Sequence, residues 1–440
     1  MDWSMPAAQL IFRHPVSQPG RALGKRMTST LRSMTGPAGL ARCKFASPRN
    51  QTCGENMFLY FDLSYYFNML RRIWHKKHWP GRNALLLRLI LVVPLLYLVH
   101  SVFFFLDKIL FPGLWFQKIE KPIFIVGHAR SGTTLLSRLL AYDADRFSFF
   151  LYWEMFFPSL LEKKIIRGLG VIDRALLNSF FFKRIQAWDD KTFGPYRHIH
   201  NMGLWVPEED DFVMNVTFFA AYWQLAAPVM DINDMFYLDR KPEKLRRRVM
   251  GTFKECVRRQ LYLCGGDKIH LSKNPVYSGR VASIIEAFPD ARILINIRDP
   301  LECVPSNMKL MEGNYLGKGW QSEDYAESLR ILETMSYDCY RMPREVLSRK
   351  TRTPHMVVDY RDLVAEPLNT IESIYNKLEL PLCEAYREQL QERDSKAREH
   401  KTTHSYSAEE YGIDTQRMLA ELEDFYQEFQ WPRPDQSSAA

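Results

Sequence analysis

Cysteine is sparse in this chain, and no two cysteines form a C-x-x-C pair. The 440 residues contain seven cysteines, an odd number scattered from Cys43 to Cys383. Structural zinc sites need closely spaced cysteine and histidine ligands, so we expect no bound metal. One or two disulfides remain possible, and nothing in the spacing requires one.

Acidic residues are absent from the first part of the chain. No Asp or Glu occurs between Trp3 and Gly54, whereas Arg and Lys are frequent there. Residues 1–57 also lack periodic apolar spacing, which predicts a disordered or targeting segment similar to an organelle transit peptide. Met57 is an equally good candidate for the functional start, because the composition changes there.

Basic clusters indicate which partners the chain favours. The net charge is +8, and a second basic cluster occupies residues 71–82. Such clusters favour anionic surfaces, either a membrane or a phosphorylated cofactor. Zinc-finger spacings and aromatic-interleaved basic repeats are lacking, so we expect no nucleic-acid partner.

Charge is absent from residues 89–106, a run of 18 residues. This run is just long enough to cross a bilayer as a helix. Pro94 and His100 weaken that signal, and the alternative is a buried or interfacial helix packed on the rest of the chain. If the helix spans, the basic flank on its N-terminal side predicts a cytoplasmic N-terminus. We interpret residues 58–110 as a basic, hydrophobic, membrane-associated segment.

Short apolar runs alternate with helical patterns beyond residue 118. Strands are predicted at 122–126, 269–272, 291–297 and 355–359. Helices are predicted at 133–142, 244–264, 278–288, 301–311, 322–349, 373–380 and 414–429. Continuous apolar runs in the strands indicate a parallel sheet covered on both faces. We therefore predict an α/β fold, a doubly wound parallel sheet flanked by helices, in a domain at 118–435 that follows an N-terminal hydrophobic helix.

The loop after the first strand is the most informative segment. Gly127 and Gly132 have the spacing of the P-loop, in which backbone N–H groups and a helix N-terminus converge on a phosphate. The Lys that a nucleoside triphosphate requires is replaced by Thr133, and the basic residue is Arg130 instead. The fold is therefore P-loop-like, and a kinase or NTPase with a degenerate Walker A loop is the less favoured interpretation.

A basic residue followed by Ser-Gly-Thr-Thr resembles the 5′-phosphosulfate loop of the sulfotransferases. These enzymes use 3′-phosphoadenosine 5′-phosphosulfate (PAPS) as donor. The resemblance implies that Arg130 reaches the bridging oxygen of the phosphosulfate. It also implies a 5′-phosphate site made by Ser131, Gly132, Thr133 and Thr134. Many members have Lys at the Arg130 position, and Arg cannot give up a proton, which puts general acid catalysis there in doubt.

Two later segments extend the resemblance. Arg298-Asp299-Pro300 and Ser306 look like the family's 3′-phosphate motif, in which the Arg and the Ser grip the phosphate on the ribose. Residues 360–367 resemble the family's Y-x-D-L-x-x-x-P segment, where we expect Asp362 to cap the next helix.

The resemblance covers residues 121–431 and is closer to the membrane-associated and bacterial branch than to the cytosolic branch. The cytosolic K-x-H-L-P strand and the C-terminal G-x-x-G-x-x-K motif are missing. At the corresponding C-terminal place, Lys401 and Tyr406 are candidates to close over the cofactor's 3′ end. A solvated basic helix end is the alternative there.

The chemistry needs a base for the acceptor hydroxyl and a cation for the sulfuryl oxygens. Residues 208–211 are four consecutive acids, and mutual repulsion should raise the pKa of one of them toward neutrality if the run is partly buried. Glu209 and Glu208 are equal candidates for the base, as other members of this branch use a Glu. An acid-rich helix N-terminus is the structural alternative, and His198 and His200 are the next candidates.

Lys273 is the candidate cation, because it ends a predicted parallel strand in a K-x-P turn like that of tyrosylprotein sulfotransferases. We therefore predict a PAPS-dependent sulfotransferase without a metal, acting on a hydroxyl of a lipid, a carbohydrate or another small alcohol. The expected location is a membrane, as a single-pass type II protein of the Golgi or, alternatively, in an organelle or on the cytoplasmic face of a membrane. The acceptor and the oligomeric state are left open, and the aromatic stretch 218–227 fits either core or an acceptor pocket.

Overall fold

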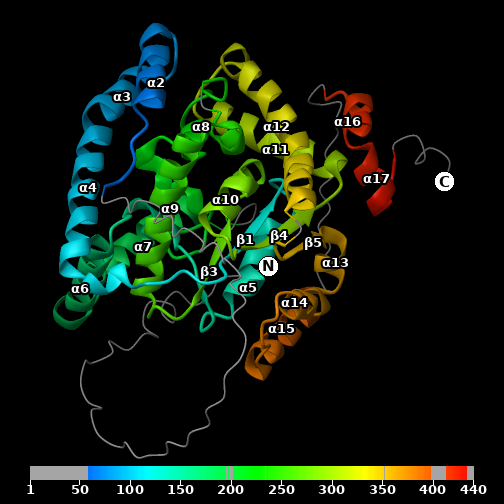
Figure 1. Cartoon of the computed structure of the whole chain (residues 1–440). Helices are drawn as coiled ribbons and strands as arrows, with labels where there is room; N and C mark the ends of the chain where they lie inside the picture. The colour runs from blue at the N-terminus through cyan, green and yellow to red at the C-terminus, as the bar shows by residue number, and fades with distance from the viewer. Residues whose placement is uncertain are drawn as a thin grey trace, which may run out of the picture.

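The centre of the molecule is a five-stranded parallel sheet. The computed structural model describes residues 58–194, 197, 202–232, 234–350, 352–397 and 413–433. The strands are β1 (Ile123–Gly127), β2 (Phe147–Ser148), β3 (Ile269–Lys273), β4 (Arg292–Ile297) and β5 (His355–Asp359). Their order in the sheet is β2-β3-β1-β4-β5 (Figure 1). The predicted α/β fold with a helix-flanked parallel sheet is confirmed.

The side chains of β1 are buried on both faces of the sheet. Ile123 and Ile125 join the hydrophobic cluster of α5 (Thr133–Ala141) and α14 (Pro367–Lys377). Phe124 and Val126 join the larger cluster on the opposite face, which includes α9 (Glu243–Leu263), α10 (Val281–Ala287) and α12 (Ser322–Arg349). Burial on both faces explains why the sequence of this strand is a continuous apolar run.

The sheet order brings three distant segments to one edge. β1 pairs with β3 on one side and with β4 on the other, with Ile125 opposite Lys273 and Gly127 opposite Asn296. The chain crosses from one side of β1 to the other between β3 and β4. That is a topological switch point, where open α/β sheets bind ligands beyond the carboxyl ends of the strands.

Several helices differ from the prediction. The predicted helix 278–288 is a 3-10 turn (Pro275–Arg280) followed by α10, and the predicted helix 301–311 continues as α11 (Pro300–Gly317). The predicted helix 373–380 is α14, which starts earlier because Pro367 suits the first helical turn. The predicted helix 414–429 is two helices, α16 (Thr415–Glu421) and α17 (Glu423–Phe429).

Further helices were not predicted at their observed places. They are α2 (Leu63–His75), α6 (Leu160–Leu177), α7 (Phe180–Phe193), α8 (Tyr222–Ala226), α13 (Tyr360–Ala365) and α15 (Glu384–Ala397). The expected cap at Asp362 is wrong. Asp362 lies inside α13, and Asp359 caps that helix by accepting a hydrogen bond from the Arg361 N–H.

One continuous helix runs from Arg82 to Leu110 and contains the predicted hydrophobic segment. It comprises α3 (Arg82–Leu87), a π-helical turn (Arg88–Val92) and α4 (Val93–Leu110). Among the described residues it is the single helix long and apolar enough to cross a membrane, judged by length and composition. It lies along one side of the molecule (Figure 1), and Leu89 and Phe104 belong to the same hydrophobic cluster as α9.

The carboxylate of Asp107 fixes α4 to two other helices. It is fully buried and accepts hydrogen bonds from the Arg259 Nε of α9 at 2.7 Å and from the Leu160 and Leu161 N–H groups of α6 at 2.9 and 2.8 Å. Asp107 therefore supplies the N-terminal donors of α6 with an acceptor and neutralises a buried guanidinium.

Replacing Asp107 by Asn should lower the free energy of unfolding by about 3 kcal/mol or more, because the buried Arg259 would lose one of its two carboxylate partners and keep only Glu255. Chemical denaturation of the full chain measures this loss. Glu120→Gln is the control, because Glu120 forms an exposed pair with Lys118 at 3.7 Å and should change stability by less than about 1 kcal/mol. Equal effects of the two substitutions would contradict the role of Asp107.

Candidate active site

The loop between β1 and α5 is shaped by two glycines. Gly127 has φ +134°, and a Cβ there would lie 2.2 Å from the Asn296 carbonyl oxygen. Gly132 has φ +89°, and a Cβ there would lie 2.5 Å from the Tyr360 ring. Both positions therefore require glycine. Gly132 is also the N-cap of α5 and provides no side-chain acceptor, so the first N–H groups of α5 suit an anionic ligand.

Ser131 stabilises this loop from within. Its side chain is buried and its Oγ donates a hydrogen bond to the His128 carbonyl at 2.6 Å. Arg130 adopts φ +70°, a conformation that is uncommon outside glycine. The Ser131 hydrogen bond closes the turn of the loop. The phosphate contacts of Ser131, Gly132, Thr133 and Thr134 remain a prediction.

The two predicted phosphate motifs meet in space. Arg130 Nε donates to Ser306 Oγ at 3.1 Å, and Arg298 Nη1 donates to the Arg130 carbonyl at 3.3 Å. The Arg298 guanidinium also lies 4.2 Å from the centre of the Tyr360 ring. Residues that are 168 positions apart in the sequence therefore form one basic corner at the ends of β1 and β4.

The acid run lies beside the end of β3. Lys273 Nζ is 3.5 Å from Glu209 Oε1 and 4.0 Å from Glu208 Oε2. Glu208 also faces Arg138 of α5 at 3.9 Å. The Glu208 side chain is 5% exposed, whereas that of Glu209 is 29% exposed. Glu209 is therefore the more accessible of the two candidate bases, and it covers the Lys273 side chain, which is 4% exposed.

Asp210 and Asp211 point into the protein and begin the 3-10 helix Asp210–Thr217. Asp210 lies 3.5 Å from His270 Nε2. Asp211 accepts hydrogen bonds from Asn274 Nδ2 at 2.5 Å and from the Ala221 N–H at 3.0 Å. Burial raises the pKa of the Asp211 carboxyl to about 7, although Arg280 opposes this shift. The raised pKa expected within the run therefore belongs to Asp211.

Two residues of this region were missed in the sequence. Arg138 follows Thr134 by one helical turn, so it lies on the same side of α5, and that spacing was an available signal. His128 is buried in the loop and stacks on Tyr340 with 5.8 Å between ring centres. Burial lowers the pKa of His128 to about 4, so the imidazole is neutral at physiological pH.

Other candidates lie elsewhere. Phe218, Phe219 and Ala220 are fully buried, and Phe218 stacks on Trp223 at 4.6 Å, so this stretch is core. His198, His200, Lys401 and Tyr406 lie outside the described residues. The described cysteines, from Cys256 to Cys383, are all free thiols.

The raised pKa of Asp211 predicts a pH-dependent stability. Between the unfolded pKa of about 3.9 and the folded pKa of about 7, the native state holds a proton that the unfolded chain has lost. The free energy of unfolding should therefore fall as pH rises through this window. Between pH 5 and pH 8 the free energy of unfolding of the wild type should fall by about 2 kcal/mol more than that of Asp211→Asn.

Denaturant titrations at pH 5, 6, 7 and 8 measure that difference. Asp190→Asn is the matched control, because Asp190 is half exposed and pairs with Arg197. If the free energies of unfolding of the wild type and Asp211→Asn differ by a constant amount over this range, Asp211 does not hold a proton in the native state.

Known proteins share both the sequence and the fold of this chain. Two curated relatives, from Mycobacterium bovis and Mycobacterium tuberculosis, are named omega-hydroxy-beta-dihydromenaquinone-9 sulfotransferase Stf3. Each is 29% identical over 292 residues, which cover 62% of this chain and 69% of the relative.

Two solved structures have a similar fold. Sulfotransferase STF9 from Mycobacterium avium aligns with a TM-score of 0.63 and 17% identity, over 86% of this chain and 95% of that one. Sulfotransferase STF1 from Mycobacterium tuberculosis aligns with a TM-score of 0.53 and 20% identity, over 81% of this chain and 90% of that one.

The family match covers the whole sheet and the segments described above. Residues 122–384 match the model of the Sulfotransferase family, which is more than half of the 440 residues. This range includes the glycine loop, the acid run, Lys273 and the Arg298 corner. The chain therefore belongs to the sulfotransferase family.

Proposed function

We propose that this enzyme transfers a sulfuryl group from PAPS to a hydroxyl group of a lipid. The observation that carries the proposal is the convergence of three segments at the carboxyl ends of adjacent strands. The glycine loop follows β1, Lys273 ends β3, and Arg298 follows β4. The groups that we assign to phosphate binding and to sulfuryl stabilisation thus lie at one edge of the sheet.

The donor would bind between the glycine loop and the Arg298 corner. The 5′-phosphate suits the open N–H groups of α5, and the 3′-phosphate suits the guanidinium of Arg298 and the hydroxyl of Ser306. Arg130 contacts Ser306 at 3.1 Å, so its charge lies between the two phosphate positions. In the described residues the loop lacks the Walker Lys, which disfavours ATP and the kinase alternative.

The acceptor hydroxyl would be activated by Glu209. Sulfuryl transfer resembles phosphoryl transfer, in which catalysis rests on positioning and charge stabilisation. Glu209 would take the hydroxyl proton while the new S–O bond forms, and adenosine 3′,5′-bisphosphate would leave. Lys273, 3.5 Å from Glu209, would stabilise the sulfuryl oxygens. Glu208, between Lys273 and Arg138, would position both cations.

The lipid acceptor is inferred from the Stf3 relatives, whose name specifies a hydroxylated menaquinone. Carbohydrates and other small alcohols are the competing acceptor classes. Membrane association fits the long apolar helix, whereas a type II arrangement in the Golgi has no support from relatives that are bacterial.

Arg298→Ala should weaken binding of adenosine 3′,5′-bisphosphate by about 2 kcal/mol or more, because a charge-assisted contact to the 3′-phosphate is lost. Isothermal titration of the full chain measures this, with AMP and ATP as comparison ligands. The wild type should prefer the 3′,5′-bisphosphate over both. Arg330→Ala, an exposed residue of α12 paired with Glu327, should leave affinity unchanged. Comparable affinities for AMP and the bisphosphate would refute the 3′-phosphate site.

Glu209→Gln should reduce turnover by roughly 100-fold or more, the usual contribution of a general base. Its affinity for the bisphosphate should stay unchanged. Glu208→Gln should reduce turnover less, because Glu208 acts through Lys273 and Arg138. Transfer of radiolabelled sulfate from PAPS to a hydroxylated quinone measures both rates. Full activity of Glu209→Gln would contradict its role as the base and would make His198 or His200 the better candidate.

A further inference from the structure

Helix α6 is inverted with respect to an ordinary surface helix. Its buried residues include Glu162, Lys163 and Asp173. Its exposed residues include a stripe of apolar side chains at helical spacing, namely Ile165, Leu169, Ile172 and Leu176. A helix of a soluble protein shows the opposite polarity, with the apolar stripe toward the core.

The buried charges of α6 all have partners, so the inversion is a stable packing arrangement. Glu162 pairs with His100 of α4 at 2.7 Å. Lys163 Nζ donates to Gln260 Oε1 of α9 at 2.8 Å. The Asp173 carboxylate accepts the Phe181 and Phe182 N–H groups at 3.0 and 2.9 Å and so caps α7.

Helix α7 repeats the inversion. Its one buried residue is Asp189, which binds Arg197 at 2.6 Å and the Leu204 N–H at 2.7 Å. Its exposed large hydrophobic side chains are Phe180, Phe181, Ile185 and Trp188. Three of these, at positions 181, 185 and 188, lie on one side of the helix because they are one turn apart.

Helix α4 continues the same surface. Its buried face carries His100, Asp107 and Lys108 together with Phe104. Its opposite face exposes Leu95, Leu98 and Val102, and the helical turn before it exposes Leu91. α4 packs against α6 and α6 against α7, and the three helices lie on the same side of the molecule (Figure 1). Neighbouring helices that each expose several apolar side chains are typical of an interaction surface.

We propose that this apolar face of α4, α6 and α7 is a membrane-binding surface that inserts in the plane of one leaflet, with anionic lipid as its partner. The charge around the face supports a lipid partner. The exposed charged residues of α6 and α7 are Lys164, Arg174, Lys183, Arg184, Lys191 and Asp190. The single acid among them is paired with Arg197, so the rim is basic and complements anionic headgroups.

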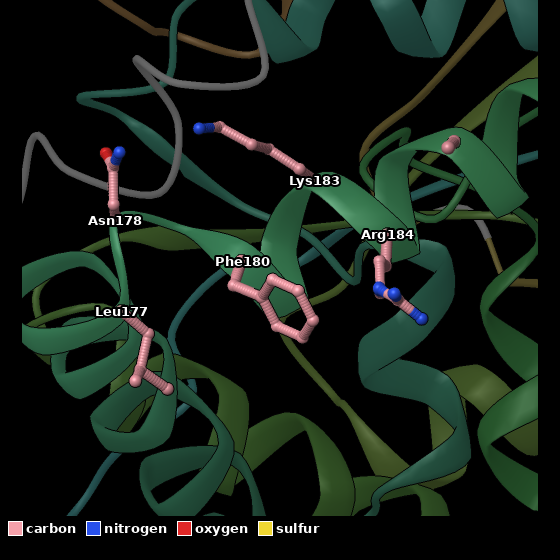
Figure 2. Close-up of a pocket in the computed structure, with 6 residues that line it drawn as sticks. Leu177, Asn178, Phe180, Lys183 and Arg184 are labelled. Atoms are coloured by element: carbon pink, nitrogen blue, oxygen red, sulfur yellow. The ribbon is translucent and has the colours of Figure 1, made fainter.

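The corner between α6 and α7 has the mixed character that a phospholipid requires. A hollow of about 350 Å³ is lined there by Leu177, Asn178, Phe180, Lys183, Arg184 and Ala187 (Figure 2). Lys183 and Arg184 bring positive charge beside apolar side chains. The positive charge suits the phosphate headgroup of a phospholipid, and the apolar side chains suit its acyl chains.

The packing of α4 favours an in-plane position over a crossing of the bilayer by the helix from Arg82 to Leu110. Asp107 and Lys108 are buried against Arg259 and Glu255 of α9 at 2.7 and 3.1 Å. If α4 crossed the bilayer, α6 and α9 would lie at hydrocarbon depth with it. Charged and irregular segments of the domain are costly there. A helix that lies in the interface needs only its outer face in lipid.

The face is connected to the acid run through α7. Phe182 of α7 packs against Trp205 with 5.7 Å between ring centres, and Asp189 holds the Leu204 N–H. Residues 204–207 lead directly to Glu208 and Glu209. A lipid acceptor could therefore reach the site from the membrane, and this last step rests on the proposed function, whereas membrane binding does not.

The proposal is tested by flotation of the full chain with vesicles of phosphatidylcholine alone or mixed with phosphatidylglycerol. We expect at least about tenfold tighter binding to the anionic mixture, with binding reduced by salt. The double variant Leu169→Glu, Ile172→Glu should bind at least about tenfold more weakly. The matched control is Leu316→Glu with Val364→Glu, two exposed apolar residues of α11 and α13, which should bind like the wild type.

Trypsin added outside intact vesicles tests the orientation. In-plane insertion predicts that the basic cluster at 71–82 and the catalytic domain are cleaved to the same extent as in detergent. Protection of either side would show a spanning helix and overturn the proposal. Wild-type affinity of the double variant for vesicles would overturn it as well. Conversion of a dimer to a monomer by that variant, with vesicle binding unchanged, would identify a self-association surface instead.

Titration with adenosine 3′,5′-bisphosphate in the same samples separates this proposal from the proposed function. Intact nucleotide binding with no vesicle binding refutes the membrane surface alone. Vesicle binding without nucleotide binding refutes the donor site alone and leaves the surface supported.

Discussion

Four consecutive carboxylates are buried or half-buried beside the sheet, and each needs a counter-charge or a set of donors. Glu208 lies near Arg138, Glu209 near Lys273, Asp210 near His270, and Asp211 near Arg280. These partners come from α5, from β3 and from the 3-10 turn after β3. Unpaired charge is unfavourable in the interior, and Asp211 reduces this cost by keeping a proton, because burial raises its pKa to about 7. The run lies where these elements meet, and this fixes the position of the candidate base.

The loop after β1 and the Arg298 corner could be recognised in the sequence because their signals are local. The spacing of Gly127 and Gly132 predicts a tight turn of the backbone, of the kind that suits an anion. Arg298 after a buried strand is equally local, and parallel strands bring both segments to one edge. The partner of each carboxylate could not be read, since the pairing of Glu208 with Arg138 depends on how α5 packs over β3.

Two of the helices that sequence reasoning overlooked, α6 and α7, were missed for the same physical reason. Hydrophobic periodicity identifies a helix when its apolar stripe faces the core. In α6 and α7 that stripe faces outward, while Glu162, Asp173 and Asp189 face inward. From the sequence alone, a charged residue in such a helix is interpreted as solvent-exposed, and an apolar stripe is interpreted as part of the core. The helix at 82–110 was recognised because its central 18 residues carry no charge. The ion pairs of Asp107 and Lys108 with α9 are tertiary contacts and could not be predicted from the sequence.

The ring of Tyr360 has a consequence for how the two ends of a nucleotide are sensed. It lies against Gly132 in the 5′ loop, and the Arg298 guanidinium stacks on it at 4.2 Å. One aromatic ring therefore contacts both Gly132 and Arg298. If the two phosphates bind as proposed, a shift of Arg298 on binding a 3′-phosphate would press on the α5 N-terminus through this ring. The binding free energies of the two ends should be coupled through this ring and should not add as independent contributions.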